Sequence, residues 1–180
     1  MHQTVEGAQV GVSDFTFRGG NDVIAGDQIP DNFDLILSGH IHRYQQLVTS
    51  LRGVELGTPV LYPGSIERTS FDERQETKGV VIVTISNMRS GRVEVEHNFV
   101  PLRTRPMVAM DLSEAELEEG LEFAVRRVVS TVDSDSVVRL RVSTDSDHSA
   151  VSADALRAMT PPEMNLTISV RSRRRRGRVD

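Results

Sequence analysis

The sequence predicts a mixed α/β protein (α+β) with two domains, and three observations support this prediction. Short apolar runs bounded by turn-forming residues recur through residues 1–100, as expected of β-strands. After residue 112 the apolar residues instead recur at helical spacing. Composition changes after Pro101, and 180 residues suffice for two small domains. We expect domains over 1–102 and 103–171, followed by a basic tail at 172–180 that is predicted to be disordered.

In the first domain, the segment 9–32 is rich in Gly, Asp and Asn. This composition indicates a long surface loop with one helical turn near 26–30. An apolar run predicts a buried strand over 33–38, and a second predicts a strongly buried strand over 79–86. The other expected elements are strands at 45–51 and 59–62, a tight turn at 63–68, a polar loop at 69–78, and a hairpin return strand at 92–100.

In the second domain, the pattern predicts the order β-α-β-α-β. A capping box at Ser113-Glu114-Ala115-Glu116 is expected to begin the first helix. Its apolar face comprises Leu117, Leu121, Ala124, Val125 and Val128. The remaining elements are strands at 106–112, 136–142 and 164–170 and a short helix at 153–159 that ends before two prolines.

Composition excludes several classes of protein. Without cysteine there is no disulfide framework, no thiolate metal site and no cysteine nucleophile. No apolar run reaches membrane-spanning length and no signal-peptide pattern is present, so we expect a cytoplasmic protein without membrane contact. The net charge is −5 despite the basic tail. This tail could bind DNA phosphates, but its composition favours a solvated segment. The arginines of the last ten residues are Arg171, Arg173, Arg174, Arg175, Arg176 and Arg178.

Three histidines form the candidate site. The run 33–38 ends at Gly39, which lets the backbone bend, and His40 and His42 follow two residues apart. In an extended segment their side chains would point to the same side. Imidazole is a common metal ligand, and strand ends at one sheet edge could bring His2 to the pair. The alternative is three partly exposed histidines near turns, and spacing alone leaves both interpretations open.

Three segments together resemble a known family: 2–8 (HQTVEGA), 38–43 (SGHIHR) and 59–71 (PVLYPGSIERTSF). In this order and spacing they are similar to the calcineurin-like metallophosphoesterases, specifically the SbcD-type DNA double-strand-break nucleases. Gly-His-x-His indicates the superfamily, and Tyr-Pro-Gly-Ser-x-Glu-Arg indicates the nuclease branch. The resemblance implies the C-terminal part of a metallophosphoesterase β-sandwich, followed by a small capping domain.

The resemblance implies a metal-dependent DNA exonuclease and endonuclease of double-strand-break repair and recombination. Two manganese ions would activate water and hold the attacking and leaving oxygens of the phosphodiester. His2 and His40 would bind one ion, and His42 the other. The turn at Gly64 and Ser65 would approach the DNA backbone. Two arginines could contact phosphate or could equally be surface salt-bridge partners: Arg43 and Arg68.

The implied partners are DNA and the SMC-like ATPase subunit SbcC. The family works as a homodimer through contacts that lie largely in its N-terminal half, so we do not expect this chain to dimerise. The family's Asp-x-His and Gly-Asn-His motifs do not occur in the sequence, and its Gly-Asp motif occurs only out of order, at Gly26-Asp27. Asp147-His148 lacks the required spacing. We therefore expect a C-terminal portion that contains no catalytic residue and is inactive alone.

Two other functions stay open. The first is a non-catalytic DNA- or partner-binding fragment with a vestigial metal face. The second is a metallophosphoesterase acting on small phosphodiesters or phosphoproteins, against which the Tyr-Pro-Gly-Ser-x-Glu-Arg stretch argues. His97 and His148 are expected to be structural or solvent-exposed.

Overall fold

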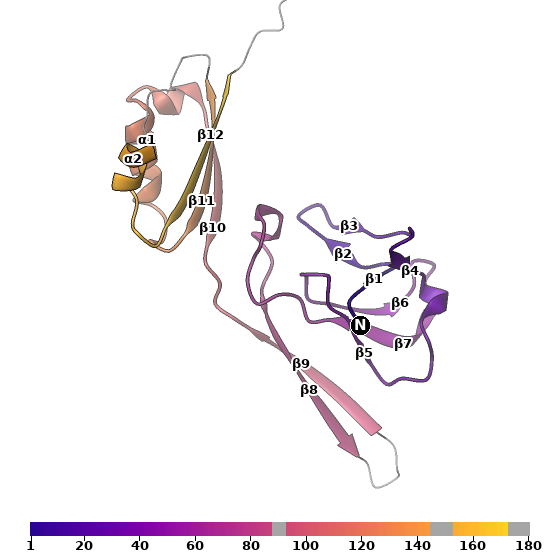
Figure 1. Cartoon of the computed structure of the whole chain (residues 1–180). Helices are drawn as coiled ribbons and strands as arrows, with labels where there is room; N and C mark the ends of the chain where they lie inside the picture. Colours follow the sequence, from indigo (N-terminus) through magenta and orange to yellow (C-terminus); the bar gives the residue numbers. More distant parts are fainter. Residues whose placement is uncertain (88–92, 145–152, 173–180) are drawn as a thin grey trace, which may run out of the picture. The chain divides into compact units, whose positions relative to one another are not determined.

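The structure is a computed structural model that describes residues 1–87, 93–144 and 153–172, and it is a mixed α/β protein made mostly of strands (Figure 1). The chain divides into two compact units, Met1–Thr104 and Arg105–Asp180, here called the N-terminal and C-terminal units. The sequence placed this division between residues 102 and 103. Among the described helices, none is long and apolar enough to cross a membrane.

The first part of the N-terminal unit is built from short strands. The segment predicted as a loop contains β2, β3 and β4, and the predicted helical turn is confirmed as the 3-10 helix η1. Parallel pairing joins β1 to β4, and antiparallel pairing joins β2 to β3. Their bounds are β1 Thr4–Val5, β2 Gln9–Val10, β3 Phe15–Thr16, β4 Val23–Ile24 and η1 Gly26–Gln28.

A three-stranded sheet follows, in the order β5-β7-β6, with β5 parallel and β6 antiparallel to β7. The bounds are β5 Ile36–Leu37, β6 Gln45–Thr49 and β7 Glu55–Tyr62. The prediction of a buried strand over 33–38 is wrong: β5 has two residues, and the side chains of Phe33 and Leu37 are exposed. An edge strand has a hydrogen-bonded neighbour on one side only, so an apolar run there need not be covered.

The core of the N-terminal unit gathers residues from across this segment of the chain. Its buried members are Val5, Ala8, Ile29, Ile41, Leu56, Val60 and Tyr62. Because these residues are far apart in sequence, the core fixes the first residues of the chain against β7 and the loop that follows β5.

The predicted hairpin at the end of the N-terminal unit is confirmed. Strand β8, Gly79–Asn87, pairs with β9, Val93–Pro101, in antiparallel register from Gly79 opposite Pro101 to Asn87 opposite Val93. The prediction that the first strand is strongly buried is wrong, because the exposed fractions of Ile82 and Ile85 are 57% and 69%. A two-stranded hairpin leaves much of both its faces uncovered unless another layer packs on it.

The C-terminal unit confirms the β-α-β-α-β order. Its three strands are parallel in the order β10-β11-β12, and Figure 1 shows both helices on one face of the sheet. Helical crossovers on one face are what parallel neighbouring strands require. The bounds are β10 Met107–Leu112, η3 Glu114–Leu117, α1 Leu121–Val129, β11 Val137–Thr144, α2 Ala153–Ala158 and β12 Asn165–Ser172.

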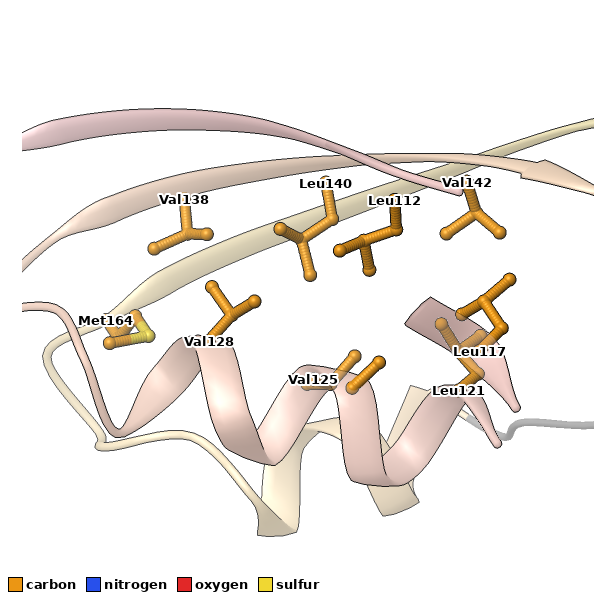
Figure 2. Packing of buried hydrophobic residues seen from close by; sticks show 10 residues of the cluster. Leu112, Leu117, Leu121, Val125, Val128, Val138, Leu140, Val142 and Met164 are labelled. Atoms are coloured by element: carbon orange, nitrogen blue, oxygen red, sulfur yellow. The ribbon is translucent and has the colours of Figure 1, made fainter. Parts of the chain in front are cut away.

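The core of this unit lies between the sheet and α1 (Figure 2). Alternate residues of the middle strand, Val138, Leu140 and Val142, are fully buried. They face the apolar side of α1, and the predicted helical face is confirmed because all five of its residues are buried. Every second residue of the strand is buried, and these residues pack against residues buried at helical spacing on α1, as in a packed α/β layer.

The helix does not begin at Ser113 as predicted. The capping box is present, with Ser113 N and Oγ each 2.8 Å from a Glu116 carboxylate oxygen, but it opens the short 3-10 helix η3. Gly120, at φ 93° and ψ 160°, then interrupts the helix, and α1 begins at Leu121. This backbone conformation is essentially restricted to glycine and is not helical.

Candidate functional site

Tyr62 and Ser38 fix the N-terminal segment in the site. The buried Tyr62 hydroxyl accepts a hydrogen bond from Val5 N at 2.8 Å and donates one to Gln3 O at 3.0 Å. Burial raises the pKa of Tyr62, although the hydrogen bonds with Val5 N and with the Ser38 side chain act to lower it. Ser38 Oγ donates to the same Gln3 carbonyl at 2.9 Å. These long-range bonds determine where His2 lies, because that side chain belongs to the segment they hold.

His2 lies directly beside the loop that carries His40. Gly39 N donates to Met1 O at 3.0 Å, and His2 and Gly39 form a parallel β-bridge. The His2 and His40 ring centroids are 5.5 Å apart with the rings edge to face. A side chain at Gly39 would place Cβ 2.5 Å from His2 Nδ1, so only glycine allows this approach without a shift.

His40 adopts a backbone conformation that is unusual for its residue type, with φ at 78°. A non-glycine residue with positive φ costs conformational energy and occurs often at functional sites. The surrounding loop holds His40 there with its ring against His2. The structure thus brings together two of the three predicted ligands from positions 38 residues apart.

His42 is fixed by different partners. Its Nδ1 lies 3.0 Å from Glu73 Oε1 and 3.2 Å from Thr69 Oγ1, and its side chain is 47% exposed. Its carbonyl oxygen accepts hydrogen bonds from Lys78 Nζ at 2.8 Å and from Ser65 N at 3.2 Å. Both the ring and the backbone of His42 are therefore held in place.

Lys78 is the centre of a buried ionic cluster. Its side chain is inaccessible to solvent, and Nζ lies 2.9 Å from Glu73 Oε2 and 2.8 Å from Glu76 Oε2. Burial acts to raise the pKa of Glu73. Hydrogen bonds from Lys78, His42 and Thr69 outweigh this effect and lower it from 4.5 to about 2. Glu73 is therefore a carboxylate near neutral pH.

Arg43 links two loops beside the histidines. Its guanidinium bonds Asp14 Oδ1 and Gly11 O, each at 2.6 Å, and Glu76 Oε1 at 3.0 Å. Burial acts to lower the pKa of Arg43, but the bonds to Asp14 and Glu76 raise it above its usual value. Of the two interpretations from sequence, the structure places Arg43 in ion pairs. Contact with phosphate stays a prediction.

The other predicted DNA contacts support the His42 loop. A Cβ at Gly64, whose φ is 79°, would lie 2.9 Å from Tyr44 N and 3.0 Å from His42 O, so this turn packs against the backbone of the histidine loop. Its neighbour Ser65 donates to His42 O. Arg68 Nε and Nη2 both donate to Glu76 O, at 3.1 and 2.9 Å. Approach of this turn to DNA stays a prediction.

A cavity of about 260 Å³ lies beside two of the three histidines. It is lined by His40, His42 and the acidic side chains Asp72, Glu73 and Glu76, and His2 is not among its lining residues. Imidazole nitrogen suits manganese and other divalent transition metals. Nevertheless, within residues 1–87, 93–144 and 153–172 no three or more His, Asp or Glu side chains form a group that could hold a metal ion. The donor chemistry fits the expected ions, but the number of donors does not complete a site.

A separate cavity of about 360 Å³, lined by residues that include Glu6 and Arg18, contains none of the histidines.

Sequence reasoning missed Glu73, Thr69 and Lys78, which lie in the segment predicted as a polar loop. Nothing in the residue pattern distinguishes a buried lysine from a solvated one. Of the remaining histidines, His97 is half-buried on β9 opposite Val83. Asp147, His148 and the tail over 173–180 lie outside the described residues.

Comparison of this chain with protein-family models and with curated proteins found no match. The function must therefore be argued from the motifs and from the geometry around the three histidines.

Proposed function

We propose that this chain contributes the imidazole side of a divalent-metal centre that hydrolyses DNA phosphodiesters, as in an SbcD-type nuclease. One observation carries the proposal: His2 and His40 lie with ring centroids 5.5 Å apart, although 38 positions separate them in the sequence. The approach depends on Gly39 and on the positive φ of His40. Such strain is retained where the surrounding structure holds it, often at functional sites.

In this proposal His2 and His40 bind one manganese ion and His42 binds the other. The metal pair supplies Lewis acidity and an activated water for phosphodiester hydrolysis. The chain's own contribution is to orient the imidazoles, through Gly39 for His2 and through Glu73 for His42. The centre needs further ligands, because the described residues supply no complete metal-binding group.

The proposal extends to the whole chain. The N-terminal unit would be part of a metallophosphoesterase β-sandwich, and the C-terminal unit would be its capping domain. Its partners would be DNA and the SbcC-type ATPase, in the cytoplasm. The parallel β-α-β-α-β layer of the C-terminal unit supports a separate domain that could cover a substrate, because it has its own core.

A second candidate function is a non-catalytic DNA- or partner-binding chain with a vestigial metal face. The observation that favours it is the incomplete ligand set among the described residues. In that case DNA would bind equally well with and without a chelator, because no metal would contribute to the interface.

Titration with Mn²⁺ tests the proposal. This paramagnetic ion broadens the NMR signals of nearby protons, so we expect the ring signals of His2, His40 and His42 to broaden first. His97, half-buried on the hairpin, serves as the internal reference. His40→Ala should weaken Mn²⁺ binding at least about tenfold. Replacing a residue that only hydrogen-bonds a metal ligand typically weakens binding by about 10–100-fold, and replacing the ligand itself should cost no less. His97→Ala should leave binding unchanged.

The same protein is then assayed on linear duplex DNA with Mn²⁺. We expect no cleavage by the chain alone, because the metal centre lacks its remaining ligands. Equal Mn²⁺ affinity in the wild type and in His40→Ala would contradict the proposed metal centre. DNA binding that persists unchanged in EDTA would favour the non-catalytic candidate.

A further inference from the structure

The Nδ1 side of His42 faces two oxygen atoms that also contact each other. Nδ1 lies 3.0 Å from Glu73 Oε1 and 3.2 Å from Thr69 Oγ1, and Thr69 Oγ1 donates to Glu73 Oε1 at 2.9 Å. A neutral imidazole carries its proton on one nitrogen only, and the hydrogen bonds around the ring decide which nitrogen that is.

These three distances select one tautomer. The Thr69 hydroxyl hydrogen points to Glu73 Oε1, so it is not available to His42 Nδ1. A carboxylate oxygen can only accept, so an unprotonated Nδ1 would place its lone pair against another lone pair at 3.0 Å. A proton on Nδ1 turns the same contact into a hydrogen bond. The geometry therefore requires Nδ1–H, and in the neutral ring this leaves the Nε2 lone pair free of a proton.

The carboxylate that imposes this tautomer is itself held in place. Glu73 Oε2 lies 2.9 Å from the buried Lys78 Nζ and accepts from Thr69 N at 3.2 Å. The side chain of Glu73 is 12% exposed. With both carboxylate oxygens engaged, rotation of Glu73 away from His42 would leave the buried Lys78 with fewer partners, which is costly.

We infer that Glu73 is the positioning residue of His42: it holds the imidazole as the Nδ1–H tautomer and presents Nε2 as a lone-pair donor to a divalent transition-metal ion. Histidine ligands commonly donate their other ring N–H to a carboxylate in this way, which fixes the ring and increases its basicity. The identity of the ligand rests on the proposed function, whereas the tautomer does not.

Two variants separate this role from a general effect on the cluster. Glu73 and Glu76 are both within 3 Å of Lys78 Nζ, but only Glu73 contacts His42. Glu73→Gln and Glu76→Gln therefore remove the same charge from the same lysine. Only the first changes the group that faces His42. Glutamine keeps a single acceptor oxygen, for which Lys78 and His42 compete, so Nδ1–H is no longer required, and Glu76→Gln is the control.

The measurement is long-range ¹H–¹⁵N correlation NMR of the full chain with labelled histidine, without metal, at a pH where the rings are neutral. We expect His42 of the wild type and of Glu76→Gln to show a protonated Nδ1 and an unprotonated Nε2. Glu73→Gln should show a mixture or the opposite tautomer. Isothermal titration with Mn²⁺ should then give roughly 10–100-fold weaker binding for Glu73→Gln and unchanged binding for His97→Ala, which lies outside the cavity.

A wild-type His42 with its proton on Nε2 overturns the inference, and so does an equal tautomer change in both variants. The wild-type spectrum needs no variant, so it decides the question even if Glu73→Gln fails to fold. A protonated Nδ1 in a chain that does not bind Mn²⁺ supports the positioning role of Glu73 and counts against the proposed function.

Discussion

At the scale of single residues, the buried Lys78 cluster determines the local structure next to the histidines. Placing a lysine out of water costs several kcal/mol unless hydrogen-bonding anions surround the ammonium group. Here two carboxylates and the His42 carbonyl surround Nζ at 2.8–2.9 Å. The same atoms that satisfy the lysine therefore fix His42, so charge burial and site geometry are linked.

This linkage predicts a specific loss of stability in acid. The folded-state pKa of Glu73 is lowered from 4.5 to about 2, so folding favours its charged form. The contribution is fully present above about pH 4.5 and is lost as the pH falls towards about 2. It amounts to up to about 3 kcal/mol, since one pKa unit corresponds to about 1.4 kcal/mol.

Urea unfolding at a series of pH values measures this contribution. Tyrosine fluorescence reports on the N-terminal unit alone, because the chain has no tryptophan and its tyrosines are Tyr44 and Tyr62. Glu73→Gln should lower the free energy of unfolding at pH 7, and its difference from the wild type should shrink between about pH 4.5 and pH 2. The exposed Glu55→Gln is the control. A difference that does not change with pH would contradict the assignment.

At the scale of elements, glycines decide where chain segments bend or approach one another. Because Gly39 has no side chain, the His2 ring can lie against it, and Gly64 allows its turn to pack on the backbone of the histidine loop. In the C-terminal unit, Gly120 separates η3 from α1. These three positions need glycine for different reasons: close contact at Gly39, contact and positive φ at Gly64, and positive φ at Gly120.

Gly120→Ala tests the break before α1. An added Cβ would meet no atom within 4 Å, so its cost comes only from the backbone at φ 93° and ψ 160°. We expect the C-terminal unit to lose on the order of 1–3 kcal/mol of stability. Native-state hydrogen exchange at the β11 amides measures this loss. Glu119→Ala, one residue earlier and exposed, should have little effect. Unchanged exchange in Gly120→Ala would show that the helix start rearranges freely.

At the scale of the whole molecule, the chain consists of two units that each bury their own apolar cluster. In the C-terminal unit the cluster joins the middle strand to α1, and all three strands pair within the unit. A domain that contains its own core and its own backbone pairing has what it needs to fold alone.

We therefore predict that a polypeptide of residues 105–180 folds on its own. Its far-UV circular dichroism should show mixed helix and strand, and its amide NMR spectrum should be well dispersed. Leu140→Ala, at the centre of its core, should destabilise it by about 2–5 kcal/mol in urea unfolding. The exposed Phe123→Ala on the outer side of α1 is the matched control. A random-coil spectrum for the isolated polypeptide would refute this prediction.

The sequence by itself determined the local elements: the β-α-β-α-β order, the buried face of α1 from Leu121 to Val128 and the β8–β9 hairpin. Each depends on a period or a turn signal within a few neighbouring residues, and such signals survive in any tertiary context that buries the apolar face. The helical turn at η1 was predictable for the same reason.

Only the tertiary structure decided burial and the composition of the site. An apolar run does not reveal whether a second layer covers it, so β5 and β8 are more exposed than predicted. The motifs identified the three histidines, but the contact of His2 with His40 depends on pairing between distant segments. The partners of His42 became visible only in three dimensions, because Glu73 and Lys78 lie more than 30 residues beyond it in the chain.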